Sequence, residues 1–181
     1  IKNNKNFNLE SVFCRNYNSK QLKFDNSIRV YENIESFFLE STNDCIYVAG
    51  SPELNFKAVN LAIKNKTPLI LEKPIGNTYE SVEKIKLLVN KYNLIIIPNL
   101  TNYFSDSFFY LKNYVDKNFD EIKRIIIFEG DNGPYRKNIH PIWDWGFHSF
   151  STLLKIFENK KFSKIIKKEI KNNKTQTNGI I

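Results

Sequence analysis

Short, wholly apolar segments that alternate with amphipathic helices place the strongest constraint on the fold. Residues 45–49, 68–71 and 94–97 are almost continuously apolar, and residues 56–63 and 79–89 between them repeat apolar side chains with a helical period. Strands that are apolar throughout, alternating with helices of about ten residues, are typical of a parallel sheet covered on both faces. The pattern therefore predicts an α/β domain.

The flanking segments extend this prediction at both ends. Residues 8–14 are predicted to form an earlier buried strand, and residues 34–39 a helix. After Pro98 the sequence predicts an aromatic-rich helix over 105–115, a strand over 122–128, a long loop over 129–141, a helix over 145–157 and a further strand from 165 onward. We expect a domain boundary near residue 100, which separates a domain of residues 1–100 from the beginning of a second at 101–181.

Composition limits the class of protein. The 181 residues are 41% hydrophobic, which is enough to bury a core. No apolar run reaches the roughly 18 residues of a membrane span, and the polar beginning lacks a secretory pattern, so we expect a cytoplasmic protein with no membrane partner. Cys14 and Cys45 have no zinc-site spacing, and we expect both to be reduced, with no metal site.

The net charge of +8 raises the possibility of a nucleic-acid partner. The lysines, however, are spread along the chain together with many asparagines. No stripe combines basic residues with aromatic stacking positions, as single-strand binders do. We therefore expect no nucleic-acid partner.

Three local patterns could support chemistry. Glu72-Lys73-Pro74 follows an apolar strand, and ligands of open α/β sheets bind at the carboxyl ends of strands. The proline restricts the backbone and can be cis, although a Lys-Pro pair at a strand end is also a common turn. A weaker pattern, Ser51-Pro52 after another strand, opens a helix whose first amides could approach a cofactor.

The third pattern is Asp144 and His148, whose spacing of four places both on one helical face. A carboxylate that orients an imidazole forms a proton shuttle near neutral pH. The alternative is a core histidine beside a helix-capping aspartate.

Together these patterns resemble the Gfo/Idh/MocA family of dehydrogenases over nearly the whole chain. The matching pieces are the turn through Gly50-Ser51-Pro52, the tripeptide Glu72-Lys73-Pro74, the strand at 95–97 with Tyr103-Phe104 behind it, and Trp143-Asp144-Trp145-Gly146-x-His148. The resemblance implies a Rossmann domain for NAD(H) or NADP(H), here truncated, then part of an α+β substrate domain whose open sheet often carries oligomer contacts.

The resemblance also implies site residues and an activity. Lys73 would polarise the reacting oxygen, His148 would be the acid/base and Asp144 would orient His148 or substrate. Ser51, Pro52, Asn55, Glu72 and Lys73 would line the cofactor site, and Tyr103 the substrate site. Apart from the resemblance, the loop that carries Tyr135 and Arg136 leads directly into the Asp144 motif, so we expect these two residues to border the substrate. The implied reaction is hydride transfer between nicotinamide and a sugar, cyclitol or sugar-nucleotide hydroxyl or carbonyl, by a homo-oligomer when full length; the alternative is a non-catalytic, cofactor- or sugar-binding regulatory member.

Several positions depart from the family pattern. Ser149 and Ser151 stand where an aspartate often follows the histidine, and Asn55 stands where a histidine is usual. No Gly-x-Gly-x-x-Gly occurs, although that turn cradles the cofactor phosphates. If the strand ending near Cys14 is the second of a Rossmann fold, the first strand and its glycine turn would precede Ile1, and we expect the chain alone to be inactive and to bind NADP only feebly.

Two arginines remain open to two interpretations. Arg15 follows the first predicted strand, where NAD-preferring folds usually have an acidic residue, which indicates a slight tilt towards NADP. Arg136 could hold an anionic group of the substrate by paired hydrogen bonds. Either arginine could equally be an ordinary surface residue.

Overall fold

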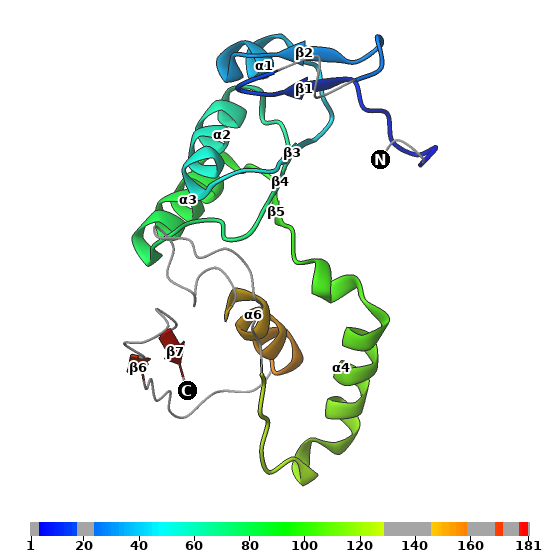
Figure 1. The fold of residues 1–181 in the computed structure, drawn as a ribbon, viewed down its shortest axis with the longest axis vertical. Helices are drawn as coiled ribbons and strands as arrows, with labels where there is room; N and C mark the ends of the chain where they lie inside the picture. Colours follow the sequence, from blue (N-terminus) through cyan, green and yellow to red (C-terminus); the bar gives the residue numbers. More distant parts are fainter. Residues whose placement is uncertain (1–3, 18–23, 129–145, 159–168, 172–177, 181) are drawn as a thin grey trace. The chain divides into compact units, whose positions relative to one another are not determined.

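The structure, a computed structural model, describes residues 4–17, 24–128, 146–158, 169–171 and 178–180 (Figure 1). The chain divides into two compact units, Ile1–Pro98 and Asn99–Ile181. In the described part of the chain, no helix is both long and apolar enough to cross a bilayer.

The first unit alternates strands and helices, as the apolar pattern predicts. Its elements are β1 (Ser11–Phe13), β2 (Arg29–Tyr31), α1 (Ile34–Glu40), β3 (Ile46–Val48), α2 (Pro52–Asn65), β4 (Leu69–Leu71), α3 (Tyr79–Tyr92) and β5 (Ile96–Pro98). β1 pairs with β2, and β3, β4 and β5 form a second sheet in that order. Every one of these pairings is parallel, which confirms the predicted α/β class.

The two long helices of this unit begin with side-chain caps and end in the left-handed conformation. The Ser51 side chain accepts a hydrogen bond from the backbone N–H of Leu54 at the start of α2, and Pro52 follows at the first helical position. Thr78 and Ser81 form a reciprocal capping box at the start of α3. Both helices end at a left-handed residue, Lys66 or Asn93.

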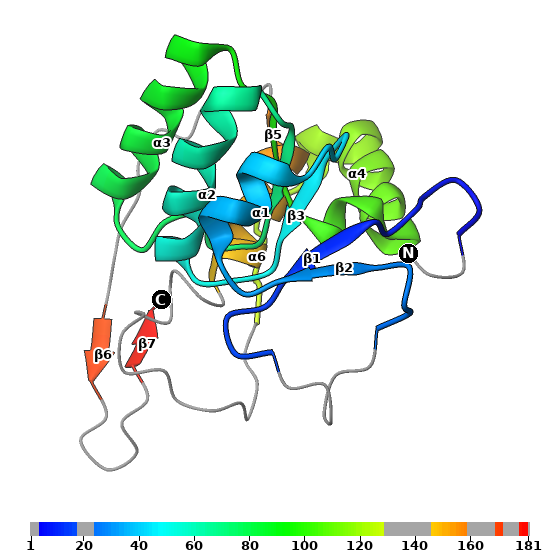
Figure 2. The same cartoon turned by 90° about the horizontal axis from the view of Figure 1, so that it is seen from above.

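The helices of the first unit form one layer against the sheet. α2 packs against α1 and α3 and also contacts β3 and β4, as the views in Figures 1 and 2 show. The core at this contact consists of fully buried residues from α2 and β4: Ala58, Val59, Ala62, Leu69 and Leu71.

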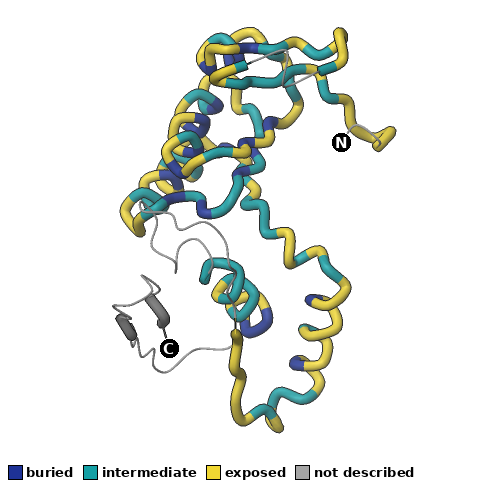
Figure 3. The backbone as a smooth tube through the Cα atoms, viewed as in Figure 1, coloured by how far each residue is buried: buried dark blue, intermediate teal, exposed yellow. Residues whose placement is uncertain are grey.

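The opposite side of the three-stranded sheet differs from the prediction. Tyr47 of β3 is 46% exposed and Ile97 of β5 is 50% exposed, whereas Ile46 and Val48 are buried (Figure 3). Because alternate residues of a strand point to opposite faces, one face of this sheet is covered and the other is open. The expectation of a sheet covered on both faces was wrong for the described residues, and β1 is half-buried rather than buried.

The second unit is mainly helical in its described part. Its elements are η1 (Thr101–Phe104), α4 (Asp106–Asn118), η2 (Phe119–Glu121), α6 (Gly146–Ile156) and an antiparallel pair of strands, β6 (Glu169–Lys171) and β7 (Asn178–Ile180). A small core joins α4 to the end of α6 and the residue after it, formed by Phe108, Val115, Ile156 and Phe157.

The predicted strand over residues 122–128 is absent. These residues have no regular secondary structure, and Phe128 is 94% exposed. A strand needs a neighbour for its backbone hydrogen bonds, and none of the described strands pairs with this segment. Conversely, the sequence analysis missed β2. The predicted loop over 129–141 and the start of the strand expected from 165 lie outside the described residues.

Candidate active site

The carboxyl edge of the three-stranded sheet brings two of the sequence motifs together. Val48 is in register with Leu71, and Leu71 with Pro98, so β3, β4 and β5 end level with one another. The turn at Gly50-Ser51 leaves β3 at this edge, and Glu72-Lys73 leaves β4 beside it. Ligands of open parallel sheets bind at this edge.

Asn55 links the two motifs by direct hydrogen bonds. It lies in the first turn of α2 and is fully buried. Its amide nitrogen donates to the backbone carbonyls of Glu72 at 3.0 Å, Pro74 at 3.3 Å and Ile75 at 3.4 Å. Asn55 therefore connects the start of α2 to the turn that carries Lys73, and its predicted contact with a cofactor stays a prediction.

Further contacts order the Lys73 turn. The Tyr47 hydroxyl donates to one carboxylate oxygen of Glu72, and the backbone N–H of Lys73 donates to the other at 3.1 Å. The peptide bond between Lys73 and Pro74 is cis, Pro74 is buried and Lys73 is half-buried. Hydrogen bonds therefore hold the backbone on both sides of Lys73, at the point where the chain leaves the sheet edge.

The residues after the turn also contact α2. The Asn77 amide donates to the Glu53 carboxylate at 3.1 Å. A hydrogen bond from the Ser51 hydroxyl, together with the backbone N–H of Glu53, lowers the pKa of the Glu53 carboxyl. The start of α2 and the segment after Lys73 therefore form one hydrogen-bonded cluster.

Arg15 lies apart from this cluster. It is exposed and follows β1, which belongs to the two-stranded sheet. This position agrees with both interpretations of Arg15, as a contact for the cofactor ribose or as a surface residue.

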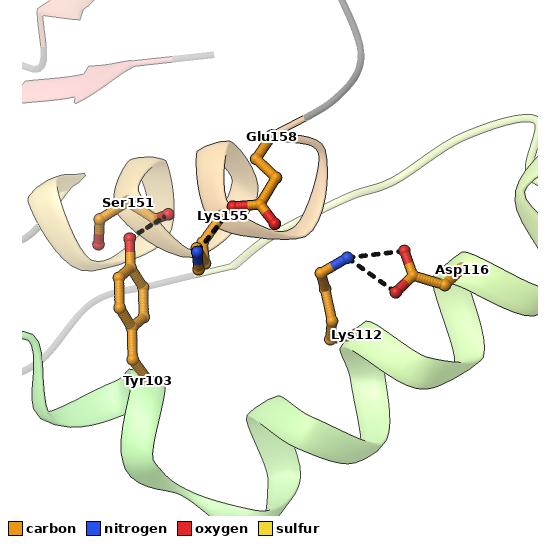
Figure 4. A network of polar contacts seen from close by, with 6 residues as sticks. All are labelled: Tyr103, Lys112, Asp116, Ser151, Lys155 and Glu158. Carbon is orange, nitrogen blue, oxygen red and sulfur yellow. Dashed lines mark hydrogen bonds and ion pairs between the residues drawn. The ribbon is translucent and has the colours of Figure 1, made fainter.

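In the second unit, the predicted acid/base lies at the beginning of α6. His148 is half-buried, and its backbone carbonyl accepts a hydrogen bond from the Ser151 hydroxyl at 3.0 Å. The Tyr103 hydroxyl donates to the backbone carbonyl of Ser151 at 2.7 Å, so it fastens η1 to α6 (Figure 4). This bond gives Tyr103 a structural role, and its contact with substrate stays a prediction.

Two ion pairs lie near this bond in the same unit. Lys112 contacts Asp116 at 2.7 Å within α4, and Lys155 contacts Glu158 at 2.6 Å at the end of α6 (Figure 4). The second pair raises the pKa of Lys155 and lowers the pKa of Glu158, chiefly through the hydrogen bond between them. Lys112 and Asp116 are four residues apart on one face of α4, whereas Glu158 lies two residues beyond the end of α6.

Three predicted site residues, Asp144, Tyr135 and Arg136, lie outside the described residues. Lys73 belongs to the first unit and His148 to the second, so their joint action is a prediction. Sequence reasoning missed Tyr47 and Asn77, which help to order the Lys73 turn. A hydroxyl-bearing side chain in the middle of an otherwise apolar strand was the available signal for Tyr47.

Comparisons with known proteins agree with this architecture. A family model described as an oxidoreductase family with an NAD-binding Rossmann fold, GFO_IDH_MocA, matches residues 1–100. No curated protein matches the chain.

Solved structures give the same fold at low identity. A putative oxidoreductase, yvaA, from Bacillus subtilis is 15% identical with a TM-score of 0.68, over 86% of this chain and 46% of that one. Scyllo-inositol dehydrogenase from Lactobacillus casei, solved with bound NAD(H) and scyllo-inositol, is 16% identical with a TM-score of 0.65, over 82% and 48%. An oxidoreductase from Bacillus cereus is 15% identical with a TM-score of 0.64, over 86% and 47%.

The chain thus spans about half the length of these solved structures. The family model matches more than half of the chain, and the parallel strands with their helix layer agree with the Rossmann fold that it describes. The chain therefore belongs to the Gfo/Idh/MocA family of oxidoreductases.

Proposed function

We propose that the whole protein is a nicotinamide-dependent dehydrogenase or reductase that acts on a hydroxyl or carbonyl of a sugar, cyclitol or sugar nucleotide. The observation that supports this most directly is Lys73, presented from an ordered turn at the carboxyl edge of a parallel sheet. The likeness to a scyllo-inositol dehydrogenase supports a polyhydroxylated substrate.

The residues at this edge fit a dinucleotide by their chemistry. The exposed Ser51 and the half-buried Glu72 and Lys73 offer both hydrogen-bond donors and acceptors along one edge of the sheet. When bound, a nicotinamide supplies the group that accepts or gives up hydride. Ser51, Glu72 and Lys73 are the residues that we expect to hold it.

The remaining roles belong to side chains of this protein. The Lys73 ammonium would donate a hydrogen bond to the reacting oxygen of the substrate and stabilise negative charge that develops there. His148 would take the hydroxyl proton during oxidation and return it during reduction, with Asp144 orienting the imidazole or the substrate. Tyr135 and Arg136 would contact the rest of the substrate.

Replacement of Lys73 tests this proposal. In the whole protein, Lys73→Ala should lower turnover by roughly 100-fold or more, because it removes a group that acts at the reacting oxygen. Lys84→Ala, at an exposed lysine of α3, is the matched control and should leave turnover unchanged. Unchanged turnover in Lys73→Ala would contradict the catalytic role. Cofactor or sugar binding without turnover in the unaltered protein would favour the regulatory alternative.

The choice between NAD and NADP rests on separate observations. The family description names NAD, and the solved scyllo-inositol dehydrogenase holds NAD(H), so the tilt towards NADP rests on Arg15 alone. If Arg15 contacts a 2′-phosphate, Arg15→Ala should lower kcat/KM with NADPH and leave kcat/KM with NADH unchanged. Equal losses of kcat/KM with NADPH and NADH, or a clear preference of the unaltered protein for NAD, would contradict the preference for NADP.

A further inference from the structure

Asn55 is the most deeply buried polar side chain in the described part of the chain. Its side chain has no solvent exposure, and no other polar or charged residue among those described is buried. Its backbone N–H donates to the Ser51 carbonyl at 3.0 Å within the first turn of α2, which fixes the position from which the side chain extends.

The amide nitrogen of Asn55 faces three carbonyl oxygens, those of Glu72, Pro74 and Ile75. Three acceptors around one atom fix the orientation of the amide, because the reverse orientation would set an oxygen against three oxygens. These carbonyls lie on both sides of Lys73 in the chain. One side chain therefore anchors the backbone segment from which the lysine projects.

The side-chain oxygen of Asn55 is buried and has no hydrogen-bond partner among the described residues. A buried, unpaired acceptor costs free energy, whereas an apolar side chain of similar size would fill the same space without that cost. The placement of an amide here is therefore explained by what its nitrogen does and not by packing.

We infer that Asn55 is a positioning residue, which holds residues 72–75 so that Lys73 is presented to the substrate in one orientation. The inference rests on the proposed function, because it acts through the role of Lys73. Positioning matters for rate because a displacement of about 1 Å at a reacting group can lower turnover by up to about 100-fold.

Two substitutions separate positioning from packing. Asn55→Leu keeps the approximate size of the side chain but removes both donors, whereas Asn55→His retains a ring N–H that can still donate to a carbonyl. Asn60→Leu is the matched control, because Asn60 lies in the same helix, is exposed, and donates to the Phe56 carbonyl one turn before it.

The expected results concern kcat and hydrogen exchange in the whole protein. Asn55→Leu should remain folded, while kcat falls roughly 10- to 100-fold. Asn55→His should recover most of that loss, and Asn60→Leu should show none. Backbone hydrogen exchange over residues 72–77 should accelerate in Asn55→Leu and stay unchanged in Asn60→Leu.

The outcomes distinguish this inference from the proposed function. If Lys73→Ala abolishes turnover while Asn55→Leu keeps full kcat, the positioning role is wrong and the catalytic role of Lys73 stands. If Lys73→Ala keeps full turnover, the proposed function fails and this inference fails with it. Unchanged hydrogen exchange over residues 72–77 in Asn55→Leu would overturn the anchoring role, whatever the activity.

Discussion

Gly76, close behind the Lys73 turn, occupies a position where no side chain fits. A β-carbon there would lie 2.2 Å from the Ser81 hydroxyl oxygen and 2.9 Å from a methyl carbon of Val82. Ser81 belongs to the capping box of α3 and cannot move away without losing its bonds to Thr78. The glycine therefore allows the turn and the start of α3 to pack closely.

We predict that Gly76→Ala lowers the free energy of unfolding by about 1–3 kcal/mol, as overpacking of a close contact usually does. Urea unfolding would measure the change. Asn90→Ala, at an exposed position of α3, should stay within about 0.5 kcal/mol of the unaltered protein. A Gly76→Ala variant of full stability would show that the Ser81 contact can relax.

Individual site residues were predictable from sequence to different degrees. Lys73 could be placed at the sheet edge because an apolar strand ends immediately before it. The bonds of Asn55 could not be foreseen, since their acceptors are backbone carbonyls 17 to 20 positions away. Such contacts depend on how α2 packs beside β4, which the local sequence does not encode.

At the scale of elements, the start of α2 combines a helix cap with a titrating carboxylate. Ser51 caps the helix and also lowers the pKa of Glu53. Because the pKa of Glu53 is lower in the folded state, Glu53 stabilises the fold above its unfolded pKa of about 4.3. This contribution is lost as the pH falls through the folded-state pKa.

Ser51→Ala should therefore lower the free energy of unfolding by roughly 1 kcal/mol at neutral pH, mainly through the lost cap. The difference from the unaltered protein should shrink as the pH falls below about 4, because the Glu53 part vanishes on protonation. Urea unfolding at pH 7 and pH 3 would measure it. In a Glu53→Gln background, Ser51→Ala should change the free energy of unfolding by the same amount at both pH values. A difference between pH 7 and pH 3 in that background would show that a group other than Glu53 causes the pH dependence.

The bond from Tyr103 to Ser151 gives a prediction for the helical unit. Tyr103→Phe removes one partly buried hydrogen bond between η1 and α6 and should lower the free energy of unfolding by about 0.5–1.5 kcal/mol. Tyr110→Phe, at an exposed tyrosine of α4, is the control and should have no effect. A stable Tyr103→Phe variant with a raised KM for substrate would instead support the predicted substrate contact.

Elements with a clear period and capping residues were predicted well. The helical period located α2 and α3, and the apolar runs located β3, β4 and β5. The error at residues 122–128 arose because apolar composition was taken as sufficient for a strand, although a strand also needs a pairing partner. β2 was missed because Val30, its central residue, stands between arginine and tyrosine in a polar neighbourhood.

At the scale of the molecule, the two parallel sheets of the first unit are not hydrogen-bonded to each other. β1 pairs with β2 and β3 pairs with β4, but β1 and β3 belong to separate sheets. A cavity of about 520 Å³ is lined by both strands and by residues of α1 and α2, among them Val12, Phe37, Val48 and Ala58. The lining is mainly apolar.

An apolar strand therefore fits this cavity better than a small polar ligand does. A strand that entered the cavity could pair with β1 and β3 at once.

We predict that the whole protein protects the backbone amides along β1 and β3 from hydrogen exchange more strongly than the 181-residue chain does. Exchange along β5, which pairs with β4 and not with either of these strands, is the internal control and should differ less. The chain alone should also bind NADH and NADPH more weakly than the whole protein. Equal protection of β1 and β3 in both proteins would show that no strand enters the cavity, and micromolar cofactor affinity in the chain alone would show that the 181 residues are sufficient for cofactor binding.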